Sequence, residues 1–127
     1  MSVAITEGIR IAVATRYMED KSEPQHEKFL FAYEITISNE GDDDAQLLTR
    51  HWIIQDATNF VDEVVGEGVI GETPILAPGR SFKYTSFCPL RTEWGIMKGT
   101  YGMVRPGGQE FDAVIAPFAL MPPYLLN

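Results

Sequence analysis

The sequence has few of the residues that cross-link small proteins or bind metals. It contains one cysteine, Cys88, and two histidines, His26 and His51, among 127 residues. A single cysteine allows no intrachain disulfide, which fits a reducing compartment. A zinc site needs several histidine, cysteine or carboxylate ligands that converge on one ion, and no C-x-x-C or H-x-x-x-H spacing occurs. We therefore predict no disulfide, no bound metal and no cofactor.

Long hydrophobic runs are also missing. The longest apolar stretch, 115–126, is broken by Pro117, Pro122 and Pro123, and it falls well short of the roughly 20 residues that a membrane-spanning helix needs. The N-terminus has neither the basic segment nor the apolar segment of a signal peptide. We expect a cytoplasmic protein with no membrane partner.

Positive charge is scarce. Ten lysines and arginines stand against eighteen aspartates and glutamates, which gives a net charge of −8 at pH 7. The basic residues are scattered singly, whereas non-specific nucleic-acid binding depends on clustered lysine and arginine. We therefore expect no nucleic-acid partner.

Helical periodicity is absent, and alternation of apolar and polar residues with a period of two dominates instead. In 28–38, five apolar side chains fall on one parity, which predicts a strand with one face in a core. The sequence predicts an all-β protein, a β-sandwich of immunoglobulin or fibronectin type III shape with about seven antiparallel strands. These strands are expected at 8–18, 28–38, 45–56, 60–65, 80–87, 95–104 and 110–116.

One domain is expected to account for the whole chain, 1–127, because 45% apolar residues suffice for a core of this size. The core should span about 5–120, followed by a C-terminal tail at 121–127. Packing along the sandwich is favoured for this proline-broken apolar segment up to Leu120, and a mobile or interfacial role beyond it.

Two of the expected strands, 28–38 and 45–56, are close enough in sequence to predict an antiparallel hairpin. The acidic triplet Asp42-Asp43-Asp44 would then lie at its tip. A run of charges is usually a solvated loop, so this interpretation is favoured over a metal site.

The most distinctive motif is a literal G-x-G-x-x-G at 66–71. In dinucleotide-binding domains such glycines bring backbone N–H groups to a pyrophosphate at a helix N-terminus. Pro74 and Pro78 stand where that helix would lie, which excludes the helical mechanism. Two interpretations stay open: a bulged strand end, which is favoured, and a backbone nest that binds phosphate without a helix. The second would use Gly66, Gly68 and Gly71, with charge partners among Arg50, Arg80 and Arg91.

Potential nucleophiles form no catalytic pattern. Cys88 has no evident helix N-terminus or neighbouring cation to lower its pKa, so a structural thiol is favoured. Ser86 and His51 could join an aspartate in a triad only on paper, because nothing resembles a nucleophile elbow. His51 is better explained as a strand histidine with a satisfied ring nitrogen. No catalytic residue is assigned.

Beyond these local patterns, the glycine motif and its continuation to Gly79 resemble the signature of the ApaG (CorD) domain family. The segments 82–86 and 95–103 resemble it as well, and the resemblance covers essentially the whole chain, as in stand-alone bacterial members. Phe87 departs from the family pattern, in which a glycine commonly follows the Thr-Ser pair.

The resemblance implies a fibronectin type III-like sandwich, an association with cobalt resistance and magnesium efflux, and no catalytic residue set. Related eukaryotic domains imply a role in protein binding. The leading hypothesis is a non-enzymatic module for interaction with an unidentified protein partner, with any metal phenotype reached indirectly. The alternative is a binder of pyrophosphate or nucleotide polyphosphates at Gly66–Gly71, and a homodimer is left open.

Overall fold

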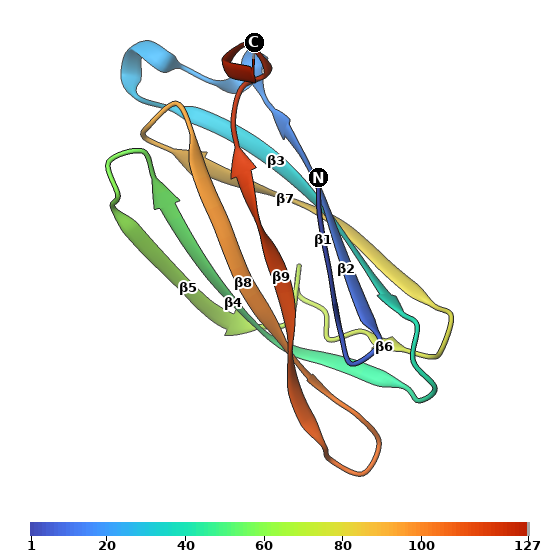
Figure 1. Cartoon of the computed structure of the whole chain (residues 1–127). Coiled ribbons are helices and arrows are strands. Elements are labelled where there is room, and N and C mark those ends of the chain that lie inside the picture. The colour runs from blue at the N-terminus through green and yellow to red at the C-terminus, as the bar shows by residue number, and fades with distance from the viewer. Residues whose placement is uncertain (127) are drawn as a thin grey trace.

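The computed structural model describes residues 1–126, which form two antiparallel sheets packed face to face (Figure 1). The strands are β1 (Ser2–Thr6), β2 (Ile9–Tyr17), β3 (Phe29–Asn39), β4 (Ala45–Asp56), β5 (Val61–Glu67), β6 (Ile75–Leu76), β7 (Ser81–Leu90), β8 (Gly95–Val104) and β9 (Glu110–Leu120). Short 3-10 turns are η1 (Glu19–Lys21), η2 (Pro24–His26) and η3 (Pro123–Leu126). One sheet has the order β1-β2-β3-β7, and the other has the order β5-β4-β8-β9 with β6 beside β4.

This architecture confirms the predicted all-β sandwich, and all seven expected strands are present. The described part of the chain contains two more, β1 and β6. The strand β6 is only two residues long, too short for alternation to reveal it. The strand β9 continues past its expected end at 116 to Leu120 although it contains Pro117. Its register with β8 shifts between Met97 and Gly99, so the proline lies at a bulge, where a missing N–H is tolerated.

The expected hairpin between 28–38 and 45–56 is wrong. The strand β3 pairs with β2 and β7, whereas β4 pairs with β5, β6 and β8. The chain therefore changes sheets between Asn39 and Ala45, and the exposed triplet Asp42–Asp44 lies in this crossing and not at a hairpin tip. Both strands bury one face as expected, but these faces meet across the sandwich and not within one sheet.

The crossing is held by Asn39, whose amide side chain is buried. Its amide nitrogen donates hydrogen bonds to the carbonyls of Asp43 and Leu76, each at 2.8 Å. Its Oδ1 accepts the backbone N–H of Gly41 at 3.0 Å. One buried amide thus connects the end of β3, the crossing and β6.

Arg105, at the start of the β8–β9 turn, ties the same end of the sandwich from the second sheet. Its guanidinium donates to the carbonyls of Asp43 and Glu7 and lies over the ring of Phe111, 5.4 Å from the centroid. A planar group with five donors can join the β1–β2 turn and the crossing at once.

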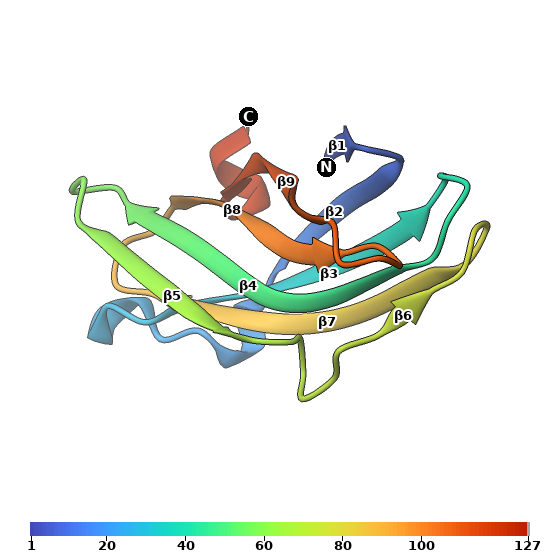
Figure 2. The same ribbon diagram turned by 90° about the horizontal axis from the view of Figure 1, so that it is seen from below.

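The two long edges of the sandwich differ. At one edge β1 lies against β9: the Ser2 hydroxyl donates to the carbonyl of Ala116, and the Val114 N–H donates to the Thr6 hydroxyl, both at 3.1 Å. At the other edge the outer strands β5 and β7 belong to different sheets and have no strand pairing between them (Figure 2). The sandwich is therefore closed on one side and open on the other.

The C-terminal segment folds back onto its own domain as far as it is described. The Tyr124 ring packs edge-on against Tyr17, and its hydroxyl donates to Glu93 at 2.7 Å. This hydrogen bond, together with partial burial and the Glu93 charge, raises the pKa of Tyr124 to about 12. The expected tail, 121–127, includes residue 127, which lies outside the described residues. No helix within 1–126 is both long and apolar enough to cross a membrane.

Replacing Asn39 with alanine is expected to lower the free energy of unfolding by about 2–3 kcal/mol, because the buried Leu76 carbonyl loses its donor. Urea unfolding followed by tryptophan fluorescence measures the change. Ser38→Ala is the matched control: it removes an exposed hydroxyl pair with Ser81 and should cost less than about 0.5 kcal/mol. Equal stability of the two variants would contradict the role of Asn39.

Candidate functional site

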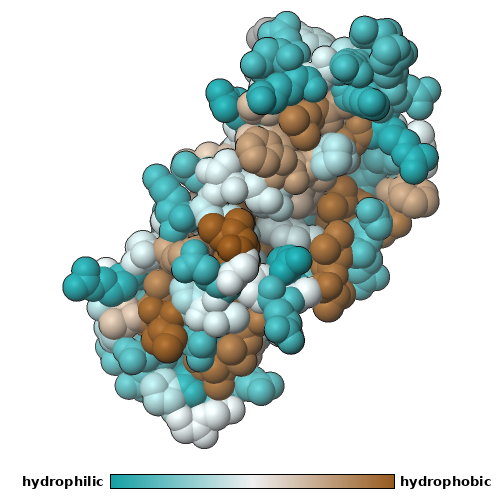
Figure 3. Space-filling view, turned by 180° about the vertical axis from the view of Figure 1, so that it is seen from behind, coloured by the Kyte–Doolittle hydropathy of each residue, from teal (hydrophilic) through white to brown (hydrophobic). Residues whose placement is uncertain are grey.

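The open edge of the sandwich contains a cleft of about 580 Å³ between β5 and β7. This volume lies within the range of small-ligand sites, roughly 300–1,000 Å³. Seen from behind Figure 1, the face that carries these strands shows separate groups of apolar side chains with hydrophilic ones between them and at its upper end (Figure 3). The cleft is the natural candidate for a functional site.

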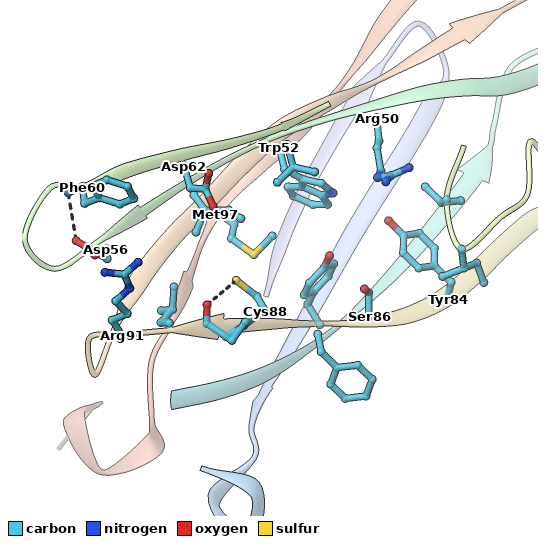
Figure 4. A pocket seen from close by; sticks show the side chains of 18 of the residues that line it. Arg50, Trp52, Asp56, Phe60, Asp62, Tyr84, Ser86, Cys88, Arg91 and Met97 are labelled. Atoms are coloured by element: carbon cyan, nitrogen blue, oxygen red, sulfur yellow. Dashed lines mark hydrogen bonds between the residues drawn. The ribbon is translucent and has the colours of Figure 1, made fainter. Parts of the chain in front are cut away.

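One wall of the cleft comes from β4 and β5. Alternate side chains of a strand point to opposite faces, so the even-numbered residues of both strands point inward together. On β4 these are Arg50, Trp52 and Ile54, and on β5 they are Asp62 and Val64 (Figure 4).

The opposite wall comes from the inward face of β7, with Tyr84, Ser86 and Cys88, and from Tyr33 on β3. Burial raises the pKa of Tyr33, although a hydrogen bond with Ser86 opposes the shift. The wall is therefore apolar and aromatic, with hydroxyl groups that carry no charge at neutral pH.

A pair of phenols connects the two sheets beneath the cleft. The hydroxyls of Tyr84 on β7 and Tyr101 on β8 share a short hydrogen bond. Burial raises the pKa of both side chains far above the ordinary value for tyrosine, so both are neutral. One hydroxyl donates to the other, so each of these buried oxygens has a hydrogen-bond partner.

Arg50 lies where the glycine motif meets the cleft. Its Nη1 donates to the carbonyls of Glu67 and Gly68 at 2.7 and 3.0 Å. The guanidinium lies so close to Gly66 that a Cβ there would be 2.7 Å from Nη2, so a larger residue would displace the Arg50 side chain. Within residues 1–126 no carboxylate forms an ion pair with Arg50.

The rest of the motif forms the end of β5 and a tight turn. The Gly68 N–H donates to the Leu48 carbonyl at 2.8 Å. Gly68 has φ of +62°, and a Cβ there would lie 2.3 Å from the carbonyl oxygen of Glu72. The motif thus presents carbonyl oxygens to Arg50, and the Gly68 donor is used in strand pairing.

The turn itself spans Val69 to Glu72, whose backbone groups exchange two hydrogen bonds of 2.9 Å. Its central residues, Ile70 and Gly71, have φ of +44° and +78°. Positive φ at both central positions is the geometry of a type I′ turn, which matches the twist of the flanking strands. Ile70 and Gly71 also line the cleft.

The three arginines that the sequence offered as charge partners lie in different places. Arg50 and Arg91 both line the cleft, whereas the exposed Arg80 lies in the turn before β7 and outside it. Near Arg91, the hydroxyl of Thr58 hydrogen-bonds to Asp56 and is the main cause that lowers the pKa of this carboxyl. The structure therefore brings Arg50 to the glycine motif and separates Arg80 from the cleft.

Cys88 is buried in the wall of the cleft, and burial raises the pKa of its thiol to about 11, with a smaller contribution from Asp62. His51 points to the outer face of β4 and hydrogen-bonds to Glu63. In the part of the chain that the structure describes, no three histidine, cysteine or acidic side chains are grouped to hold a metal ion.

Sequence reasoning did not assign Trp52, Tyr84 or Met97 to a site. They lie within the expected strands 45–56, 80–87 and 95–104, where an apolar or aromatic residue is typical of an ordinary core. That they border a cleft follows only from the pairing of β4 with β5 and of β7 with β3.

The fold and the site together define a β-sandwich domain with a cleft at one open edge. A family model described as the ApaG domain matches residues 19–105. The chain is 54% identical to Protein ApaG of Anaeromyxobacter sp. (strain K), with all of both chains covered. It is 51% identical to Protein ApaG of Shewanella oneidensis over 98% of each chain. The chain belongs to the ApaG domain family.

Solved structures agree with this assignment. A crystal structure from Bordetella pertussis, described as an ApaA protein, has a TM-score of 0.89 and 45% identity, covering 91% of this chain and 94% of that one. An X-ray structure of a structural-genomics target has a TM-score of 0.88 and 52% identity, covering 94% and 91%. The sandwich described above is therefore shared with these proteins.

Cys88 is expected to resist alkylation by iodoacetamide at pH 8. With its pKa raised from 9.0 to about 11, the thiolate fraction in the folded protein is about 100-fold below that of the unfolded chain. The rate for the folded protein should rise about tenfold per pH unit between pH 8 and 10, whereas the rate in urea should level off above pH 9.

The same raised pKa means that the neutral thiol contributes stability below pH 9 and that this contribution declines as the pH rises towards 11. Circular dichroism at pH 10 serves as the control that the fold is intact during labelling. Equal rates for folded and unfolded protein at pH 8 would contradict the burial of the thiol.

Proposed function

We propose that this protein is a non-enzymatic binding module that engages another protein through the cleft between β5 and β7. The observation that carries the proposal is the composition of the cleft, which combines Tyr33, Trp52, Met97 and Arg50. Tyrosine, tryptophan, methionine and arginine are the side chains enriched at the centres of protein interfaces. Arg50 is also half-buried and has no ion-pair partner among the described residues.

The surroundings of the cleft support the same function. Phe60 and Ile70 line it although more than half of each residue is exposed, at 62% and 56%. Large apolar side chains that gather around a concavity are typical of interaction sites.

The proposal includes a cytoplasmic location, which suits a single buried thiol and the absence of disulfides in residues 1–126. An association with cobalt resistance or magnesium efflux would act through the protein partner, and no step of it requires a metal ion bound to this chain.

Binding of pyrophosphate or a nucleotide polyphosphate is a second candidate, favoured by the presence of Arg50 and Arg91 in one cleft. Two observations weigh against it at Gly66–Gly71. The Gly68 N–H is already bonded to Leu48, and Arg50 is bonded to carbonyls of the motif. A phosphate nest needs free backbone donors, so we rank this candidate below protein binding.

Val64→Glu is expected to abolish specific capture of a protein partner, because it places a charge in the cleft. Tagged wild-type and variant proteins are compared by affinity purification and quantitative mass spectrometry. Val114→Glu is the matched control, since Val114 is a similarly exposed strand valine at the closed edge, 45% exposed against 36% for Val64. Capture that is absent from the wild type, or equally reduced in both variants, would argue against the cleft.

Titration with pyrophosphate, ATP or diadenosine tetraphosphate is expected to give no saturable heat and no shift of the Gly66, Gly68 and Gly71 amide resonances. Calorimetry and ¹⁵N-resolved NMR make the measurement. Saturable shifts at these amides that disappear in Arg50→Gln would establish the phosphate candidate instead.

A further inference from the structure

The strand β5 is an exposed edge directly beside the cleft. It pairs with β4 on one side and has no strand on the other among residues 1–126. Six of its seven residues are exposed. An edge strand of this kind presents unpaired backbone groups to which another chain can add.

The free backbone groups can be assigned from the hydrogen bonds at the two ends of the ladder. The Asp56 N–H donates to the Phe60 carbonyl, and the Gly68 N–H donates to the Leu48 carbonyl, in the same register that pairs β4 with β5. In antiparallel pairs, bonded positions alternate with non-bonded ones. Even-numbered residues of β5 therefore bond to β4, and the backbone groups that point away from β4 belong to Val61, Glu63 and Val65.

The other edge strand at the cleft, β7, carries residues that oppose the addition of another strand. The Asn39 N–H donates to the Arg80 carbonyl in the register of β3 and β7, so the outward positions of β7 are odd-numbered. One of them is Pro89, which has no N–H, and another is Lys83. Proline and lysine are typical of edges that resist strand addition. The edges β1 and β9 cover each other, and β6 is only two residues long, which leaves β5 as the accessible long edge among residues 1–126.

A strand added to β5 would have two distinct faces. Residues opposite Asp62 and Val64 would point into the cleft, where the walls are aromatic and apolar. Residues opposite Glu63 would point to the outer face, because side chains of directly opposed residues lie on the same face. The geometry therefore suits a segment that alternates apolar residues with residues of another kind.

The negative charges on and beside β5 indicate that these other residues of the added strand are basic. The outer face of β5 carries Glu63 and Glu67, Asp62 borders the cleft, and neither Asp62 nor Glu67 has an ion-pair partner in the described chain. Basic residues in the added strand would complement these carboxylates. A second copy of β5, paired antiparallel in the register centred on Glu63, would put Glu63 opposite Glu63. Like charges directly opposed are destabilising, which disfavours self-pairing in this register.

We infer that β5 accepts an extended segment of a partner protein as an additional antiparallel strand, with its apolar residues in the cleft and alternating lysines or arginines beside Glu63 and Glu67. The inference rests on the proposed protein-binding function and specifies its partner. Strand addition uses backbone hydrogen bonds for affinity and alternate side chains for specificity.

The test uses an acetylated and amidated heptapeptide in which lysines alternate with phenylalanine and valine. Binding to the full chain is measured by calorimetry, and amide exchange is followed by NMR. We expect saturable binding and slowed exchange of the Val61, Glu63 and Val65 amides. A peptide with glutamates in place of the lysines is expected to bind at least about tenfold more weakly.

N-methylation of the peptide separates strand addition from simple insertion into the cleft. In an antiparallel pair the lysine amides face β5, so methylating them should abolish binding, whereas methylating the apolar residues should not. On the protein, Val65→Pro removes an outward N–H and is expected to weaken binding at least about tenfold. Thr85→Pro, at an outward position of β7, is the matched control and should have no effect.

Binding without protection of the β5 amides, or equal sensitivity to both sets of methyl groups, would overturn strand addition while leaving the cleft as a protein-binding site. No binding of either peptide at about 1 mM would overturn it as well. Loss of partner capture in both Val64→Glu and Val114→Glu would instead count against the proposed function itself, so the two failures are distinguishable.

Discussion

The change of sheet at Asn39 is the constraint on which the other features depend. A buried amide that bonds to Asp43, Leu76 and Gly41 fixes the end of β3, the crossing and β6 together. Of these partners, the Leu76 carbonyl is bonded in a buried position, where losing its donor would leave it without water to replace it. Because β3 and β4 are sent to different sheets, β7 and β5 become the outer strands at the same edge, and the cleft is the space between them.

The polar groups that border the cleft are hydrogen-bonded within the protein. The phenols of Tyr84 and Tyr101 link the sheets below it, and Arg50 is held at one end by the carbonyls of Glu67 and Gly68. The glycine motif owes its composition to this arrangement: Gly66 leaves room for the guanidinium, and Gly68 leaves room for the Glu72 carbonyl. These glycines are thus explained by close approach of the protein to itself, with no need for a bound phosphate.

The two strands at the mouth of the cleft, β5 and β7, are protected in different ways against the addition of another strand. Pro89 lies at an outward position of β7 and removes a donor, whereas β5 relies on Asp62, Glu63 and Glu67. A proline blocks any added strand, but negative charge blocks acidic strands and favours basic ones. With a net charge of −8, the protein would avoid pairing with itself and still accept a segment of opposite charge, as expected of a binding module.

Much of the fold was readable from local pattern, and much of the site was not. Alternation with a period of two predicted seven strands, and the prolines at 74 and 78 excluded a dinucleotide-type helix. The same pattern suggested a hairpin between 28–38 and 45–56, missed β1 and β6, and could not tell Arg50 from Arg80. Alternation reports which face of a strand is buried. It does not report which strand lies beside it, because pairing is decided by contacts between residues far apart in the chain. The sequence by itself determined seven of the nine strands found in residues 1–126, because alternation is a local property. Only the tertiary structure decided that β5 and β7 share an open edge, because pairing depends on residues far apart in the chain.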